Sequence, residues 1–270
     1  MSQLLPPICF LGSGRLANAL IKGFLKSGLV KPQQITTSSK SGVSAQTLAA
    51  EYGIKAASDN ISAIEAASII FLCTKPADAL ATLSALRPHL NNKLIISVAA
   101  GIRTASLFEA AGNKARIIRT MPNTAVRVGK GVTSITAHAS ATKEDIIFTK
   151  NLFSSVGVIF EIPEKQKDAF TALSGSGPAF ALLFLEGLMQ GGIEEGLDSA
   201  LARTLAAHTL AAAAALILET EDTPEKLRAE ITSPNGTTAA GIAELEKATV
   251  VKTVELAVHA AKARAEQLAL

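Results

Sequence analysis

Short apolar runs alternate with helix-periodic stretches from Ile8 to about Ile162, and this alternation restricts the fold of the chain more than any other feature. Continuous apolar runs are typical of strands that are covered on both faces, and their alternation with helices predicts a parallel sheet. The expected strands are ICFL (8–11), QQITTSS (33–39), IIFLCT (69–74), LIISVA (94–99), ARIIRT (115–120) and VGVIFEI (156–162).

The pattern changes at Pro163. No stretch beyond it has a period of two, and the remainder predicts helices at 166–173, 178–195, 199–218, 224–231, 238–248 and 251–268. We therefore expect an α/β domain over residues 1–162 and an all-helical domain over 163–270. The helix from Pro178 is apolar nearly all round, and about a hundred residues have too little interior to hide it. A second copy of the chain is expected to cover it.

Composition and charge exclude several classes of protein. The chain has 26 Lys and Arg against 23 Asp and Glu, spread along its length, so a nucleic-acid partner is not expected. Cys9 and Cys73 lie in apolar runs, which favours buried thiols in a reducing compartment. The N-terminus shows no signal-peptide pattern, and the alanine-rich run 205–218 is shorter than a bilayer span. These features predict a cytoplasmic protein with no membrane partner.

A glycine-rich turn follows the first expected strand and opens a helix. It matches the G-x-G-x-x-G/A pattern, in which glycines let the backbone approach a pyrophosphate at a helix N-terminus. An ordinary tight turn has the same composition, but the context of strand, turn and helix favours dinucleotide binding. The predicted pyrophosphate site comprises Gly12, Ser13, Gly14, Arg15, Leu16 and Ala17.

The end of the second expected strand bears on which dinucleotide is bound. NAD-dependent proteins place an acidic residue there, against the ribose hydroxyls. This chain has Ser38, Ser39 and Lys40 instead, and hydroxyls with an ammonium group suit a 2′-phosphate. NADPH is therefore the expected cofactor and NADH the alternative, although Ser and Lys are also common in loops that bind nothing.

Two further segments end expected strands at the edge where open α/β sheets bind ligands. They are Thr74-Lys75-Pro76 and Ala99-Ala100-Gly101, and either could be a simple turn. In the helical half, SGSGP (174–178) suits a plain helix start as well as a close approach by a ligand or partner chain.

The segment ITSPNGTTA (231–239) precedes an expected helix and combines hydroxyls with residues that permit unusual backbone angles. Free N–H groups at a helix N-terminus can bind a carboxylate without any arginine. Helix capping by Ser233 or Thr237 would account for the same residues, and both interpretations can hold together.

The sequence does not favour catalysis by a histidine base or binding of a metal ion. His89, His138, His208 and His259 lie in unrelated settings, so none is expected to act as a base. No cluster of His, Cys or Asp has metal-ligand spacing, and no metal is expected.

Taken in order, the motifs resemble one family, the pyrroline-5-carboxylate reductases. The matching segments are FLGSGRLANAL, FLCTKP, SVAAGI, RTMPNTAVRVGKG, ALSGSGPAF and TSPNGTTAAGIAELE, from Phe10 to Glu246. The resemblance implies a Rossmann-type N-terminal domain and a helical C-terminal dimerisation domain, with a homodimer that can assemble further into a ring of dimers. It also implies NAD(P)H-dependent reduction of the cyclic imine 1-pyrroline-5-carboxylate to L-proline, the final step of proline biosynthesis.

The resemblance also implies roles for individual residues. Asn60 would lie on the adenosine side, Cys73, Thr74, Lys75 and Pro76 along the dinucleotide, and Ala99, Ala100 and Gly101 near the nicotinamide. Thr238 would be the catalytic residue, with its hydroxyl on the ring nitrogen. The substrate site, contributed by the partner subunit, would comprise Glu221, Ser233, Asn235, Gly236, Thr237 and Thr238.

Two positions depart from the family pattern. Asn235 stands where the family usually has a glycine, and because Asn tolerates positive φ the loop is expected to keep its shape. Arg15-Leu16 replaces the more usual Asn-Met and adds a cation that can contact a phosphate.

Two other functions stay open. A β-hydroxyacid-dehydrogenase-like reductase would need a lysine base that the Pro178 helix lacks, and a non-catalytic dinucleotide-binding paralogue would not need the Thr238 loop.

Overall fold

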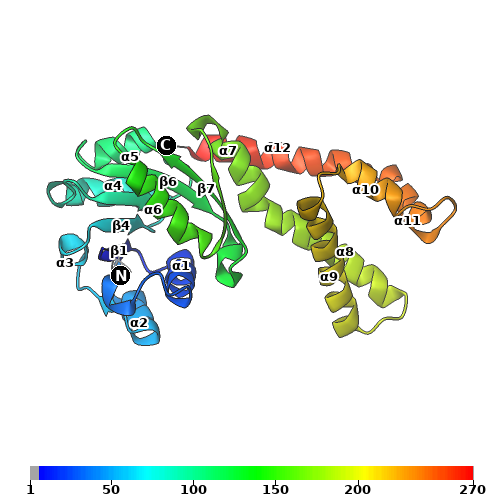
Figure 1. Cartoon of the computed structure of the whole chain (residues 1–270), viewed down its shortest axis with the longest axis horizontal. Helices are drawn as coiled ribbons and strands as arrows, with labels where there is room; N and C mark the ends of the chain where they lie inside the picture. Colours follow the sequence, from blue (N-terminus) through cyan, green and yellow to red (C-terminus); the bar gives the residue numbers. More distant parts are fainter. Residues whose placement is uncertain (1–5, 270) are drawn as a thin grey trace. The chain divides into compact units, whose positions relative to one another are not determined.

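The structure is a computed structural model that describes residues 6–269, and the chain divides into two compact units (Figure 1). The first comprises Met1–Gly175 and Lys262–Leu270, and the second Ser176–Ala261. The predicted boundary at residue 162 falls one residue after the last strand, which ends at Glu161, whereas contacts keep the chain with the first unit up to Gly175. The reason is that the segment after Pro163 packs its Lys167 side chain, fully buried, against the sheet.

The first unit is built on one eight-stranded sheet. Its strands are β1 (Ile8–Leu11), β2 (Ile35–Ser38), β3 (Lys55–Ala56), β4 (Ile69–Leu72), β5 (Leu94–Ser97), β6 (Arg116–Pro122), β7 (Gly131–Ala137) and β8 (Gly157–Glu161). The strand order is β3-β2-β1-β4-β5-β6-β7-β8. All pairs are parallel except β6 with β7. The strand order reverses after β3, so that β4 lies beside β1 and the switch point falls between these two strands. This is the order of a doubly wound dinucleotide-binding fold.

Helices cover both faces of the sheet, as the continuous apolar strands predict. One core forms between the sheet and α1 (Arg15–Lys26), α2 (Val43–Tyr52) and α6 (Lys143–Ser154). The other forms against α3 (Asn60–Glu65), α4 (Pro76–Leu86) and α5 (Thr104–Ala110). Phe10 and Phe71 from neighbouring strands stack with ring centroids 4.7 Å apart. The expected Rossmann-type parallel-sheet domain is confirmed.

Two strands were not expected from the sequence. β7 reads GVTSITA, in which small and hydroxyl side chains interrupt the apolar pattern, and β3 has only two residues. β7 is recognisable as a strand only through its pairing with β6 and β8.

The second unit is all-helical. It contains α8 (Gly177–Glu194), α9 (Ser199–Glu219), α10 (Pro224–Glu230), α11 (Thr237–Lys247) and most of α12 (Val250–Leu268). α7 (Lys167–Phe170) and the π-helical turn η5 (Thr171–Ser176) precede it. The helical C-terminal region predicted after Pro163 is therefore confirmed.

The long helices of the second unit leave large apolar side chains exposed in the single chain. Leu182, Leu183, Leu201 and Leu205 are all at least 44% exposed. Two stretches, Glu164–Glu194 and Ser199–Glu219, are long and apolar enough to cross a membrane on length and composition alone. The expectation that the alanine-rich run is too short was wrong on length, because the helix extends beyond it at both ends.

Candidate active site

The glycine turn lies between β1 and α1 at the carboxyl edge of the sheet. Gly12 has φ of +102°, and a Cβ atom there would lie 2.6 Å from the carbonyl oxygen of Cys73. The Gly12 N–H donates to the carbonyl oxygen of Ser38 at 3.0 Å. Glycine is therefore required both by the backbone angle and by the close approach of the next strand.

The first turn of α1 has the geometry of an anion cradle. Gly14 is the N-cap, no side chain caps the helix, and nothing lies within 4 Å of the position a Cβ would take. The N–H groups of the first helical residues have no intrahelical acceptor. Backbone N–H groups in this arrangement bind phosphate, which the helix dipole also favours.

The residues predicted for the adenosine side lie at the end of β2 and the start of α3. Ser38 donates its hydroxyl to Asn60 Oδ1 at 2.8 Å, and its carbonyl oxygen accepts the hydroxyl of Ser13 at 3.0 Å. The structure therefore joins Ser13, Ser38 and Asn60, three residues predicted separately. Ser39 lies in the loop that follows and accepts from the N–H of Ala45, while Lys40 is exposed. Among residues 6–269, no acidic side chain stands at the end of β2.

The ends of β4 and β5 complete this edge. Cys73 follows β4, where its N–H donates to the carbonyl oxygen of Leu11. Burial raises the pKa of the Cys73 thiol, so it stays protonated and is not a nucleophile. Thr74 Oγ1 is buried without a hydrogen-bond partner among residues 6–269. Lys75 and Pro76 open α4, and the Ala99 N–H is held by Ser97 Oγ at 3.3 Å.

Asn123 lies in the matching segment RTMPNTAVRVGKG, but the sequence assigns it no role of its own. Its Oδ1 accepts from the N–H groups of Ala125 and Val132, and its Nδ2 donates to the carbonyl oxygen of Ser174 at 3.1 Å. It thus ties the end of β6 to the SGSG turn. The only signal in the sequence is an amide directly after a proline that ends a strand.

A buried ionic network lies next to these segments and was also not predicted. Lys167 Nζ donates to the Arg119 carbonyl oxygen at 3.1 Å and to Ser134 Oγ at 2.9 Å. Arg119 pairs with Glu164 at 3.1 Å, and both oxygens of Glu164 accept from Thr104. Burial, and secondarily the charge of Arg119, lowers the pKa of Lys167 to about 6, while Glu164 opposes the shift.

This pKa makes stability depend on pH. An unfolded chain holds the Lys167 proton up to its usual pKa, whereas the folded chain releases it above about pH 6. Between these two pKa values the unfolded state therefore binds more protons, and the free energy of unfolding rises with pH by up to about 1.4 kcal/mol per pH unit.

Urea unfolding at pH 6.5, 7.5 and 8.5 should show this rise in the free energy of unfolding for the wild type, and Lys167→Met should remove it. Lys165→Met, at an exposed position, is the control. Equal slopes in wild type and Lys167→Met would contradict the prediction.

The second unit contains the predicted substrate loop, directly before α11. Asn235 has φ of +57°, so the expectation that Asn serves here in place of glycine is confirmed. The N-cap of α11 is Gly236, and no side chain caps the helix. Capping by Ser233 or Thr237 is therefore ruled out, because Gly236 takes the capping position. The first N–H groups of α11 are left without intrahelical acceptors.

The remaining predicted residues of this unit lie near that loop in sequence. Thr238 is half-buried in the first turn of α11, and its hydroxyl makes no hydrogen bond within residues 6–269. Glu221 is exposed in the connection between α9 and α10. In the described part of the chain, no group of three or more His, Cys, Asp or Glu could hold a metal ion.

Comparisons with known proteins agree with this architecture. Residues 164–268 match the family "Pyrroline-5-carboxylate reductase dimerisation", and residues 7–101 match "NADP oxidoreductase coenzyme F420-dependent". A pyrroline-5-carboxylate reductase of Methanosarcina acetivorans is 37% identical over 262 residues, covering 97% of each chain. That of Arabidopsis thaliana is 36% identical, covering 96% of this chain and 94% of the plant protein.

Solved structures of pyrroline-5-carboxylate reductases are also similar to this chain over nearly its whole length. The Plasmodium falciparum pyrroline carboxylate reductase with NADP bound superposes with a TM-score of 0.89 at 30% identity, covering 98% of both chains. The Coxiella burnetii enzyme has the same TM-score and identity. The dimerisation match explains why the helices of the second unit expose apolar faces in a single chain. With this sheet, this glycine turn and relatives matched over nearly their whole length, the chain belongs to the pyrroline-5-carboxylate reductase family.

Proposed function

We propose that this protein reduces 1-pyrroline-5-carboxylate to L-proline with NADPH, the last step of proline biosynthesis. One observation carries the proposal. In a chain of this family, α11 begins at an uncapped N-terminus with Thr238 in its first turn. Such a helix start can hold a carboxylate through backbone N–H groups while a hydroxyl reaches the neighbouring ring nitrogen.

The cofactor fits the residues of the first unit. The cradle at Gly12 and Gly14 leaves room for a pyrophosphate that any Cβ at Gly12 would disturb, and Asn60 and Ser38 lie on the adenosine side. Cys73 to Pro76 and Ala99 to Gly101 would line the rest of the dinucleotide. NADPH, when bound, supplies the hydride. The absence of a carboxylate at the end of β2 favours the 2′-phosphate of NADPH over NADH.

The substrate-binding residues would act mainly by orientation. Backbone N–H groups from Ser233 to Thr238, contributed by the partner subunit, would bind the carboxylate of the imine. Thr238 would place its hydroxyl on the ring nitrogen and stabilise the amine that forms as the carbon–nitrogen double bond is reduced. Glu221 would hold a proton on the substrate side. Most of the rate enhancement then comes from holding two reactants in contact, which requires few reactive side chains.

The assembly follows from the apolar helices. Homo-oligomerisation is supported by the dimerisation match over residues 164–268. We propose that residues 1–162 bind the dinucleotide and that residues 163–270 form the dimer and the substrate loop, with dimers arranged further into a ring. The proposed location is the cytoplasm. Light scattering at several concentrations distinguishes a dimer from a ring of dimers.

The activity is tested directly by loss of NADPH absorbance with 1-pyrroline-5-carboxylate. We expect turnover with NADPH and a KM at least about tenfold higher with NADH, because a lost charge-assisted contact to the 2′-phosphate costs about 1.5–3 kcal/mol. Formation of proline, measured by chromatography, must match NADPH consumed. No turnover with either cofactor, in protein that binds NADPH, would favour a binding module over an enzyme.

A further inference from the structure

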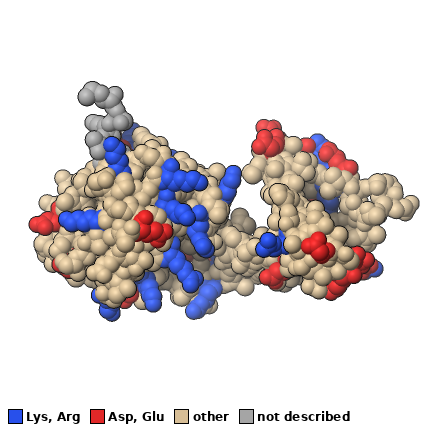
Figure 2. Space-filling view, turned by 90° about the horizontal axis from the view of Figure 1, so that it is seen from below, with Lys and Arg blue, Asp and Glu red and all other residues tan. Residues whose placement is uncertain are grey.

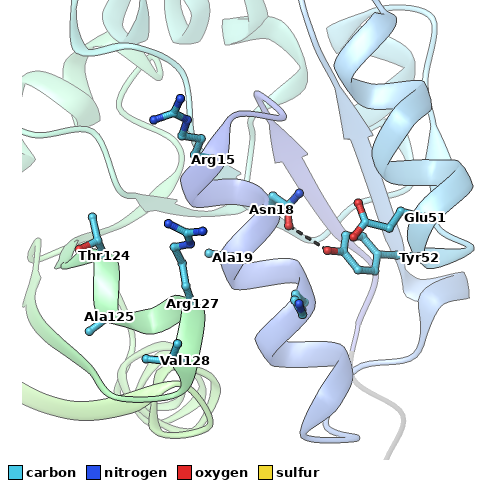
Figure 3. Close-up of a pocket in the computed structure, with 10 residues that line it drawn as sticks. Arg15, Asn18, Ala19, Glu51, Tyr52, Thr124, Ala125, Arg127 and Val128 are labelled. Carbon is cyan, nitrogen blue, oxygen red and sulfur yellow. Dashed lines mark hydrogen bonds between the residues drawn. The ribbon is translucent and has the colours of Figure 1, made fainter. Parts of the chain in front are cut away.

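A second polar groove lies on the first unit, lined by α1, the end of α2 and the 3-10 turn η3 (Thr124–Val128). Its volume is about 700 Å³. Figure 3 shows α1 between two walls, with η3 on one side and the end of α2 on the other. Figure 2 shows Lys and Arg gathering on the face of this unit seen there, with few Asp and Glu among them.

Three cations line the groove without acidic partners. Arg15 and Lys22 lie two turns apart on α1, and Arg127 extends from η3 (Figure 3). Within residues 6–269, none of the three forms an ion pair or a side-chain hydrogen bond, and all three are exposed. Unpaired charges of one sign around a concavity concentrate counter-ions there. Arginine is also suited to bidentate contact with phosphate oxygens.

Neutral donors add to the cations. Tyr52 donates its hydroxyl to Asn18 Oδ1 at 2.9 Å, which orients the Asn18 amide (Figure 3). The Asn18 Nδ2 group, which has no acceptor within residues 6–269, can then donate to a ligand in the groove. Thr124 contributes a hydroxyl from the opposite wall. The one carboxylate of the lining is Glu51, beside Tyr52. Burial first, and Glu51 second, raise the pKa of the Tyr52 phenol. The groove therefore offers side-chain donors from α1 and η3, and its lining contains a single carboxylate, Glu51.

We propose that this groove binds the phosphate group of a small anion, at a site separate from the pyrophosphate cradle. A dianion with several acceptor oxygens matches three cations and fixed N–H donors better than a single carboxylate does. The groove extends from Arg15 two helical turns along α1, away from the carboxyl edge of the sheet where the dinucleotide binds.

Arg15 links the two sites. It also lines a groove of about 430 Å³ beside the glycine turn, together with Ser41 of the loop after β2 and Ser44 in the first turn of α2. One guanidinium cannot serve both grooves fully. Phosphate binding in the α1 groove therefore weakens NADPH binding, and by linkage NADPH weakens phosphate binding by the same factor.

The test is calorimetric titration of the full-length protein with inorganic phosphate, against chloride at equal ionic strength. We expect saturable binding in the wild type, weakened about tenfold or more in Arg127→Met and in Lys22→Met, each of which removes a charge-assisted contact. Lys114→Met, an exposed lysine in the loop before β6, is the matched control and should bind as the wild type does. Absence of phosphate binding, or binding that neither variant weakens, overturns the proposal.

A second titration identifies the source of the phosphate group. With 2′,5′-ADP in place of phosphate, Arg127→Met and Lys22→Met should bind as the wild type does, because the cofactor's own 2′-phosphate lies elsewhere. Weakened 2′,5′-ADP binding in both variants, or complete loss of phosphate binding in NADPH-saturated protein, would assign the groove to the cofactor and overturn a separate site. Neither readout requires turnover, so a failure here is distinct from a failure of the proposed reaction.

Discussion

Replacing Thr238 by alanine should lower turnover by more than tenfold while NADPH binding stays near that of the wild type. The hydroxyl lies in the first turn of α11 and has no partner within residues 6–269, so it is available to the substrate. A hydrogen bond that strengthens as the ring nitrogen becomes an amine stabilises the transition state more than the ground state. Its loss therefore appears in kcat more than in KM.

Three measurements make this result interpretable. Thr238→Ser keeps the hydroxyl and should recover most of the turnover, whereas Thr238→Val keeps the shape and should not. NADPH binding, followed by fluorescence titration, should be unchanged in all three variants because Thr238 belongs to the helical unit. An alanine variant that turns over at the wild-type rate removes Thr238 from the mechanism.

Gly12→Ala should abolish NADPH binding and destabilise the first unit. The alanine methyl would lie 2.6 Å from the Cys73 carbonyl oxygen, at a φ of +102° that residues other than glycine rarely adopt. Backbone strain alone costs about 1–3 kcal/mol. To avoid this contact the glycine turn must move away from β4. That movement breaks the hydrogen bond from the Gly12 N–H to the Ser38 carbonyl oxygen and displaces the pyrophosphate cradle. Urea unfolding and NADPH titration measure the two effects.

Gly14→Ala separates stability from binding. Gly14 has a negative φ of −77°, and its Cβ would have nothing within 4 Å, so the free energy of unfolding should change little. NADPH affinity should still fall, because the added methyl would occupy the space needed by the pyrophosphate. If Gly12→Ala and Gly14→Ala had the same free energy of unfolding and the same NADPH affinity, the glycine turn would not form the pyrophosphate cradle.

Much of the fold could be predicted because its signals are local. The apolar strands β1, β4 and β5 are buried on both faces, and such strands show as unbroken runs in the sequence. β7 could not be found in this way, because its hydroxyl residues become buried only by pairing between β6 and β8.

In the candidate site too, the features set by local sequence could be predicted and those set by distant contacts could not. The glycine turn and the loop before α11 could be predicted because backbone angles and helix starts demand particular residue types at particular positions, as Asn235 shows. Asn123 and Lys167 could not, because their roles consist of contacts across 51 and 33 residues of chain.

The alternation of strands and helices, the glycine turn after β1 and the helix start at α11 could be predicted from the sequence, because each depends on neighbouring residues. The burial of Lys167 beside Arg119, and the groove shared by Arg15, Lys22 and Arg127, became visible only in the folded chain. Burial and the spacing of charges depend on which segments meet in space, and the local pattern of a chain does not carry that information.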